Sequence, residues 1–227
     1  MVIMLHDKPH NQRGLFLCPK QCIIIILIHT LYVSYRSDLM NSVEPIRDVK
    51  QIQEMKEALA YYGSERDVFL FNLGINCGLR VSDMLNLKKK DIKGYTIKLR
   101  EQKTRKQKQI PLYHLKEDID RYIRFLGDED YLFKSNKLDS GGNSRPISRV
   151  QAYRILNHSA KSIGLNEIGT HSMRKTFGYH YYKKTKDVAL LMDLFNHSSQ
   201  SVTLRYIGIN QDIINNSIAT IMKDIFK

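Results

Sequence analysis

Six side chains in this sequence are of types that could act together on a phosphodiester bond. They are two arginines, two histidines, one lysine and one tyrosine, in the order Arg80, Lys103, His171, Arg174, His197 and Tyr206. A tyrosine hydroxyl needs a base or strong positive potential to attack phosphorus, because its reference pKa is about 10. Guanidinium groups match phosphate oxygens, and a lysine can protonate a leaving oxygen. The set predicts attack by Tyr206.

His171 and Arg174 have the spacing of two residues on one helix face. Residues i and i+3 are neighbours, so both side chains can meet one substrate, and the free N–H groups at a helix start favour an anion. The same spacing recurs at His10 and Arg13. Taken alone, the pair therefore favours a structural role.

Arg80 follows Gly78, which permits a sharp turn of the backbone before it. Its planar fork of donors suits two phosphate oxygens. Two further possibilities stay open for this segment. One is a salt bridge from Arg80 to Asp83, and the second is a helix-turn-helix DNA-reading motif, although its second helix would be short.

Residues 88–109 are strongly basic, with ten basic residues and two acidic ones. Lys103 lies in the expected turn of a hairpin, from which an amine can reach into a groove. Lys106 and Lys108 compete with it for that role. Most lysines in such a run only neutralise backbone phosphates. The residues expected to contact the DNA backbone are Lys88, Lys89, Lys90, Arg105, Lys106 and Lys108.

His197 and Tyr206 enclose a ten-residue segment that follows a short apolar helix. A histidine in that place could simply interact with the helix dipole. Tyr206 is one of 13 tyrosines, so its type alone favours a place in the core or on the surface. Arg80, Arg174 and the two histidines would supply the positive potential that a nucleophile needs.

The composition is that of a globular protein with an anionic partner. The 227 residues are 42% hydrophobic and 26% charged, and this composition excludes disordered and fibrous classes. The net charge is +13. The charge indicates nucleic acid first and an anionic membrane second. Cys18, Cys22 and Cys77 make no disulfide framework, which favours reduced thiols in the cytoplasm. The Cys18–Cys22 pair has no second pair nearby, so no metal site is expected.

Residues 1–40 differ from the rest of the chain. The apolar run 22–33 has 12 residues, whereas a membrane-spanning helix needs about 20. Three basic residues precede the run as in a signal peptide, but no small-residue cleavage site follows it. We favour an appended or mis-started leader, with the working chain beginning near Met40. A buried strand is the remaining alternative.

Hydrophobic periodicity and capping residues predict a mainly helical chain after residue 45. Gly63 should end the first helix, and Ser64 should cap the second. Two short strands, 95–99 and 109–112, should flank the basic turn. The predicted helices cover residues 46–62, 64–77, 81–87, 115–126, 148–163, 171–184, 187–195 and 212–226.

Together these segments resemble the tyrosine recombinase (phage integrase) family. The family's first-arginine motif is similar to Gly78-Leu-Arg-Val-Ser-Asp-Met-Leu-Asn-Leu87, and its hairpin-lysine motif is similar to Lys103-Thr followed by Ile110-Pro-Leu112. Its His-x-x-Arg motif is similar to His171-Ser-Met-Arg-Lys-Thr-Phe177, and its closing motif is similar to His197-Ser-Ser with Tyr206. Four motifs in the family's order are far more specific than any one of them. The resemblance covers about residues 45–227.

The resemblance implies a fold and a reaction. The fold would be α+β, mainly α, with a small antiparallel β-sheet. Tyr206 would attack a scissile phosphate to give a 3′-phosphotyrosine, and Arg80 and Arg174 would hold the non-bridging oxygens. Lys103 would protonate the leaving 5′-oxygen. The phosphotyrosine keeps the bond energy, so rejoining to another strand needs no ATP.

The resemblance also implies the remaining roles and the partners. His171 would act as acid or base near the tyrosine, and His197 would hydrogen-bond the phosphate. The partner would be double-stranded DNA. The apolar C-terminal helix would pack on a neighbouring protomer, giving a homo-oligomer on DNA. No metal or other cofactor is implied, and a membrane partner is not expected.

Two features depart from the family pattern. Asn196 stands where the family usually has glycine. Most members also carry a helical core-binding domain before the catalytic domain, whereas here only residues 1–40 precede a catalytic domain assigned to residues 41–227. The alternatives are a non-catalytic DNA-binding remnant, a type IB topoisomerase-like relaxase and, as the weakest, a membrane-surface protein.

Overall fold

A computed structural model describes residues 43–166, 168–210 and 216 of the chain. These residues belong to one compact unit, Val43–Lys227. The leader predicted at 1–40 and, apart from Asn216, the helix predicted at 212–226 lie outside the described residues.

The helices begin and end where the sequence places capping groups. Asp48 caps α2 by accepting a hydrogen bond from the backbone N–H of Lys50, and Gly63 ends that helix. Ser64 and Asp67 form a capping box at the start of α3. The helical elements are α2 (Val49–Tyr62), α3 (Glu65–Cys77), α4 (Val81–Leu85), η1 (Lys89–Asp91), η2 (Tyr113–Leu115), α5 (Lys116–Ile123), α6 (Arg149–Ser162), α7 (Thr170–Thr185), α8 (Val188–Phe195) and α9 (Gln200–Tyr206).

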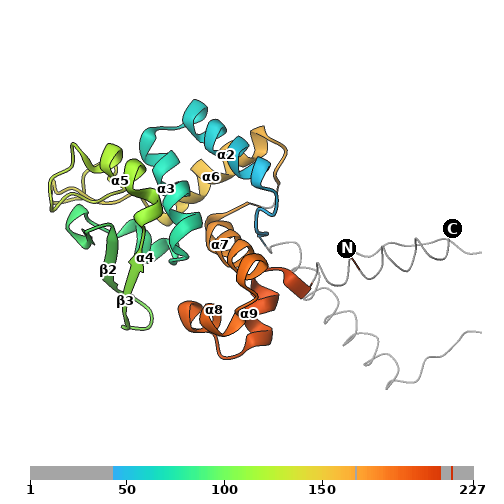
Figure 1. Cartoon of the computed structure of the whole chain (residues 1–227). Coiled ribbons are helices and arrows are strands. Elements are labelled where there is room, and N and C mark those ends of the chain that lie inside the picture. Colours follow the sequence, from blue (N-terminus) through green and yellow to red (C-terminus); the bar gives the residue numbers. More distant parts are fainter. Residues whose placement is uncertain (1–42, 167, 211–215, 217–227) are drawn as a thin grey trace, which may run out of the picture. The chain divides into compact units, whose positions relative to one another are not determined.

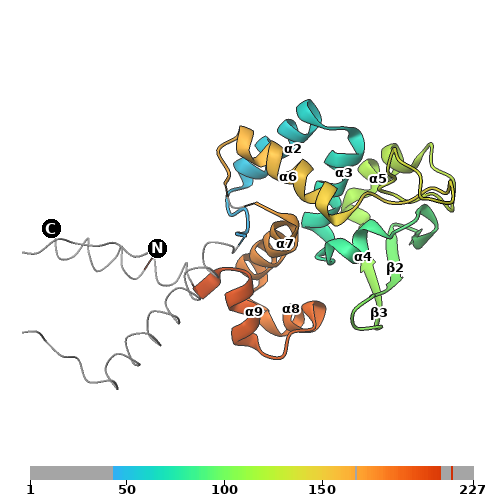
Figure 2. The same ribbon diagram turned by 180° about the vertical axis from the view of Figure 1, so that it is seen from behind.

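Helices α3 and α7 pack against each other at the centre of this unit (Figure 1). The approach is close because Gly74 of α3 faces Met173 of α7, and a Cβ on Gly74 would lie 2.5 Å from the Met173 Sδ. Helix α6 lies beside α2 on the side that faces the viewer in Figure 2. Met173 of α7 belongs to the main hydrophobic core, which thereby fixes the start of the helix that carries His171.

The basic segment forms a three-stranded antiparallel sheet of order β1-β2-β3. Strand β1 (Ile92–Lys93) was not predicted, and the predicted hairpin strands are β2 (Thr96–Arg100) and β3 (Gln107–Pro111). Ile97 pairs with Ile110, and both are buried. This register places residues 101–106 in the turn, whose tip lies beside α8 in both views.

Helices α8 and α9 form a second, smaller core on the end of α7. Phe195 and Ile207 are fully buried there with Leu191. Gly178 of α7 permits this contact, since a Cβ at that position would lie 2.7 Å from the Ile207 Cγ2 and 2.9 Å from the Phe195 ring. Helix α9 was not predicted, and it brings Tyr206 to His171 in the first turn of α7.

Replacing Gly178 by alanine should separate α7 from the smaller core. The added methyl group would clash with Ile207 and Phe195, and the higher helix propensity of alanine offsets only part of that cost. We expect the free energy of unfolding to fall by about 1–2 kcal/mol, measured by urea denaturation. Gly141→Ala, in an exposed loop, is the control and should change it by less than about 0.5 kcal/mol. Unchanged stability in Gly178→Ala would contradict the tight packing.

Candidate active site

Arg174 is buried at the junction of α3, α7 and α8. Its side chain lies in the first turns of α7 and is 3% exposed. Nη1 donates to the carbonyl oxygen of Gly78 at 2.5 Å, and Nη2 donates to that of Phe195 at 3.0 Å. The guanidinium also stacks on the Phe195 ring, 4.2 Å from its centroid. These contacts fix the group before any substrate binds.

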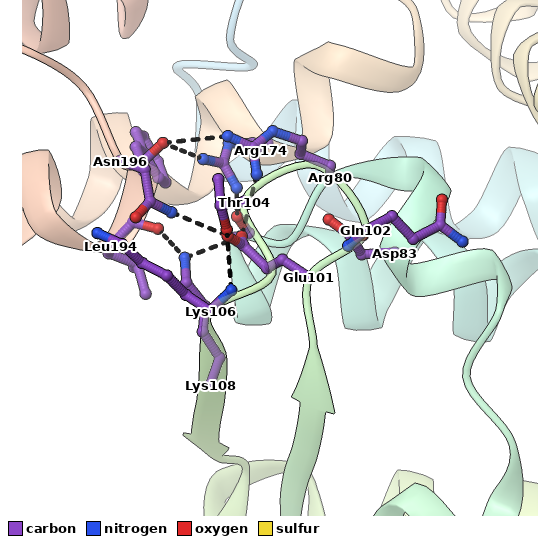
Figure 3. Close-up of polar contacts among 12 residues, drawn as sticks. Arg80, Asp83, Glu101, Gln102, Thr104, Lys106, Lys108, Arg174, Leu194 and Asn196 are labelled. Atoms are coloured by element: carbon purple, nitrogen blue, oxygen red, sulfur yellow. Dashed lines mark hydrogen bonds and ion pairs between the residues drawn. The ribbon is translucent and has the colours of Figure 1, made fainter.

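Arg80 approaches the same carbonyl from the start of α4. Its Nη2 donates to the Phe195 oxygen at 3.4 Å, and its Nη1 forms an ion pair with the Glu101 Oε1 at 3.0 Å. Figure 3 shows the two guanidinium groups side by side. The alternative of a local salt bridge from Arg80 to Asp83 is wrong, because Arg80 pairs with Glu101. The Asp83 Oδ1 accepts from the backbone N–H of Gln102.

Tyr206 and His171 meet beside these arginines. The Tyr206 Oη lies 3.5 Å from the His171 Nδ1, at the long limit of a hydrogen bond. Burial raises the pKa of Tyr206, while the charges of Arg174 and Arg80 act to lower it. The hydroxyl therefore keeps its proton in the free protein, and His171 is placed to accept it.

The way in which α8 ends fixes the position of His197. Asn196 adopts a left-handed conformation with φ 53°, and its N–H and that of His197 bond back to Asp193 and Met192, which is a Schellman ending. The His197 Nδ1 lies 3.1 Å from the Thr203 Oγ1. Its ring centroid is 5.0 Å from that of Tyr206.

Lys103 lies on the exposed side of the β2–β3 turn and lines a groove of about 660 Å³. Arg80 and His171 line the same groove. The groove is thus bounded by one predicted residue from each of three motifs. Lys103 reaches the groove from the hairpin turn, and His171 reaches it from α7.

The basic residues predicted to contact the DNA backbone lie in three different surroundings. Lys88 and Lys90 form ion pairs with Glu129, and Lys89 lies 3.8 Å from Asp128. Arg105 and Lys106 lie exposed on the turn, whereas Lys108 is directed inward to Glu101. Their contact with DNA remains a prediction, which the turn residues fit best because their side chains face solvent.

Sequence reasoning missed two residues at this site. Glu101 is 0% exposed and contacts Arg80, and its only signal was being one of two acids in the basic segment. Arg149, the first residue of α6, lines the groove with Lys103 and His171. In the sequence, Arg149 simply follows the capping residue Ser148, and this position does not indicate that it lines the groove.

Within the described residues, no group of three or more His, Cys, Asp or Glu side chains is arranged to hold a metal ion. Over the same residues, no helix combines the length and apolar character needed to cross a bilayer.

Comparison with known proteins identifies the class. Residues 46–212 match the phage integrase family model, so the chain belongs to that family. The chain is 47% identical over 175 residues to "Probable integrase/recombinase YoeC" of Bacillus subtilis (strain 168), covering 76% of this chain and 93% of that protein. The resemblance stated from the four motifs is confirmed, and so is the prediction of a DNA recombinase.

Solved structures share the fold. The crystal structure of XerA recombinase matches with a TM-score of 0.59 and 19% identity, covering 78% of this chain and 64% of that one. A lambda integrase tetramer bound to a Holliday junction matches with a TM-score of 0.56 and 19% identity, covering 72% and 48%. The predicted fold class is confirmed. The chain spans about half the length of several other curated recombinases that it matches.

The two histidines should make the protein less stable in mild acid. Burial, followed by the charge of Arg174, lowers the pKa of both His171 and His197. Below a pH of about 6.5 the unfolded chain then binds more protons than the folded one, so the free energy of unfolding falls as pH falls.

Urea denaturation at several pH values between about 7.5 and about 5.5 measures this slope. His171→Gln and His197→Gln should each make the fall shallower. Slopes equal to that of the unchanged protein in both variants would show that these histidines titrate alike in the folded and unfolded states.

Proposed function

We propose that the chain catalyses site-specific DNA breakage and rejoining through a 3′-phosphotyrosine formed by Tyr206. The observation that carries this proposal is the position of the Tyr206 hydroxyl, next to His171 and within the field of Arg174 and Arg80. The four groups come from three separate segments of the chain, and their convergence suits an attack on phosphorus.

The reaction follows from the placement of these groups. The Tyr206 oxygen bonds to phosphorus and passes its proton to His171, while the bond from phosphorus to the 5′-oxygen breaks. Lys103 protonates that oxygen from the hairpin side of the groove. Arg80 and Arg174 stabilise the negative charge that develops on the non-bridging oxygens.

His197 completes the clamp by donating a hydrogen bond to the phosphate. Its Nδ1 already meets the Thr203 Oγ1, so the hydrogen bond to the phosphate would come from Nε2. The lowered pKa favours the neutral ring, which has this N–H in the tautomer whose Nδ1 accepts from Thr203. Reversal of the same steps, with another strand's 5′-hydroxyl as the nucleophile, rejoins the DNA. The phosphotyrosine conserves the energy of the broken bond, so these steps consume no ATP.

The substrate we propose is double-stranded DNA, bound by several copies of the chain. Solved structures with this fold include a XerH recombinase bound to its difH substrate, a lambda integrase dimer bound to a core site and a lambda integrase tetramer bound to a Holliday junction. The net charge of +13 fits a polyanion. We further propose that the helix predicted from sequence at 212–226, which lies outside the described residues apart from Asn216, packs on a neighbouring copy. We also propose that the protein acts in the cytoplasm.

Covalent capture of DNA tests the nucleophile. Duplexes that bind the protein are first selected from a randomised pool, and each is then nicked at successive positions. Cleavage close to a nick releases a short strand that diffuses away, so the covalent adduct accumulates. A slow band on a denaturing gel should appear with the unchanged protein and should be lost in Tyr206→Phe, which retains the ring packing. An adduct in Tyr206→Phe would refute the assignment of the nucleophile.

The same preparation separates the alternative functions. Relaxation of any supercoiled plasmid, with no preferred site among trapped duplexes, would favour a topoisomerase-like relaxase. Salt-dependent DNA binding without an adduct on any duplex would favour a non-catalytic remnant. Liposome flotation of a chain starting at Met40 addresses the membrane-surface alternative.

Arg149 should contact a DNA phosphate, because its exposed side chain lines the groove. Arg149→Gln should weaken DNA binding and reduce the slope of log affinity against log salt by about 0.9, measured by fluorescence anisotropy. Arg124→Gln removes another exposed charge that does not line this groove, and it should leave the slope close to that of the unchanged protein. Equal slopes in the two variants would contradict a specific contact at Arg149.

A further inference from the structure

Glu101 is a buried carboxylate at the end of β2 with a partner on every side (Figure 3). Its Oε1 lies 3.0 Å from both the Arg80 Nη1 and the Lys108 Nζ. Its Oε2 accepts from the Thr104 Oγ1 at 2.5 Å and from the Asn196 Nδ2 at 2.9 Å. Two of these partners belong to the hairpin, one to α4 and one to the end of α8.

The end of α8 is held by the same group of side chains. Lys108 donates to the carbonyl oxygen of Leu194, and both Arg80 and Arg174 donate to that of Phe195. The next side chain, Asn196, reaches Glu101. Consecutive residues at this helix end are therefore tied to the hairpin and to the arginines.

The hairpin turn and the α8 end carry different parts of the reaction. Lys103 lies between Glu101 and Thr104 in the turn, whereas Asn196 directly precedes His197 and the short helix that carries Tyr206. The bond from Asn196 to Glu101 joins side chains that are 95 positions apart in sequence. It is a direct contact between the segment with the leaving-group lysine and the segment with the nucleophile.

We infer that Glu101 and Asn196 are positioning residues that hold the Lys103 turn in register with the His197–Tyr206 segment. The inference rests on the proposed function, because it assigns to Lys103 the protonation of the leaving oxygen. Hydrogen bonds to a charged group are stronger than those between neutral groups. Displacement of a catalytic group by about 1 Å can cost on the order of a hundredfold in rate. The hydrogen bond from Asn196 to Glu101 should therefore affect the rate by keeping the Lys103 turn in place.

The identity of residue 196 suits this role. The position needs a left-handed backbone, which glycine and asparagine both adopt. Glycine would preserve the turn but could not reach Glu101. Asparagine supplies the turn and, in addition, a donor to the buried carboxylate.

The contacts of Glu101 and Asn196 decide which substitutions can test the inference. Glu101→Gln would disturb Arg80, which binds the phosphate in the proposed reaction, so its effect would not be confined to the turn. Asn196→Gly removes the tie alone, and Asn196→Asp places a second carboxylate against Glu101. Asn143→Gly makes the same chemical change in an exposed loop and is the matched control.

Adduct formation on two forms of the selected nicked duplex measures the effect on Lys103. One form has the natural 5′-oxygen at the scissile bond, and the other has sulfur there, which leaves as a thiolate and needs no proton. We expect Asn196→Gly to be about 10- to 100-fold slower on the oxygen duplex and close to the unchanged protein on the sulfur duplex. Asn196→Asp and Lys103→Ala should give the same pattern, whereas Asn143→Gly should match the unchanged protein on both.

An unchanged rate of Asn196→Gly on the oxygen duplex would overturn the inference. So would an equal loss on both duplexes, because the tie would then act on the nucleophile or the phosphate clamp instead of Lys103. Hydrogen exchange of the free proteins gives a second measure, in which the peptide covering residues 101–106 should exchange faster in Asn196→Gly than in Asn143→Gly. Equal exchange would also overturn it. A missing adduct with the unchanged protein on both duplexes would instead refute the proposed function, while the exchange measurement would still test the tie.

Discussion

The site depends on one buried carboxylate that allows several cations to gather. Arg80 and Lys108 both contact Glu101, and Arg174 lies beside them. Two like charges about 4 Å apart repel by about 4 kcal/mol at an effective dielectric constant of 20. Burial opposes ionisation of Glu101, but hydrogen bonds from Thr104 and Lys108 outweigh it, and its pKa is lowered. The ionised carboxylate offsets part of the repulsion and leaves the groove positive.

Backbone geometry places the groups around that carboxylate. Gly78 ends α3 in a left-handed conformation with φ 61°, and its carbonyl oxygen accepts from Arg174. A side chain at this position would also meet the Phe177 ring at 2.6 Å. Gly178 permits equally close packing on the other side of α7, where α8 and α9 lie. The candidate site thus depends on helix backbones that contact neighbouring side chains too closely to tolerate a Cβ.

The sequence predicts the local parts of this arrangement well. Capping residues and periodicity set most helix bounds within a few residues, because those signals act over one or two turns. The sequence does not predict which residues that are distant along the chain come into contact. Asp83 was considered as the partner of Arg80 because it is three residues away, whereas the structure brings in Glu101 across 21 positions. An acid in a basic run has the pattern of a solvated residue, and only the hairpin register and α8 together bury it.

Helix α9 has only seven residues and begins soon after the Schellman ending of α8. Such a short connection places Tyr206 beside His171 of the same chain, within the field of Arg174 and Arg80. In the proposed reaction the nucleophile and the two arginines would therefore come from one copy. Exchange between duplexes would then require the freed 5′-hydroxyl end to leave its own site and attack the phosphotyrosine of a neighbouring copy, while each tyrosine stays in its own subunit.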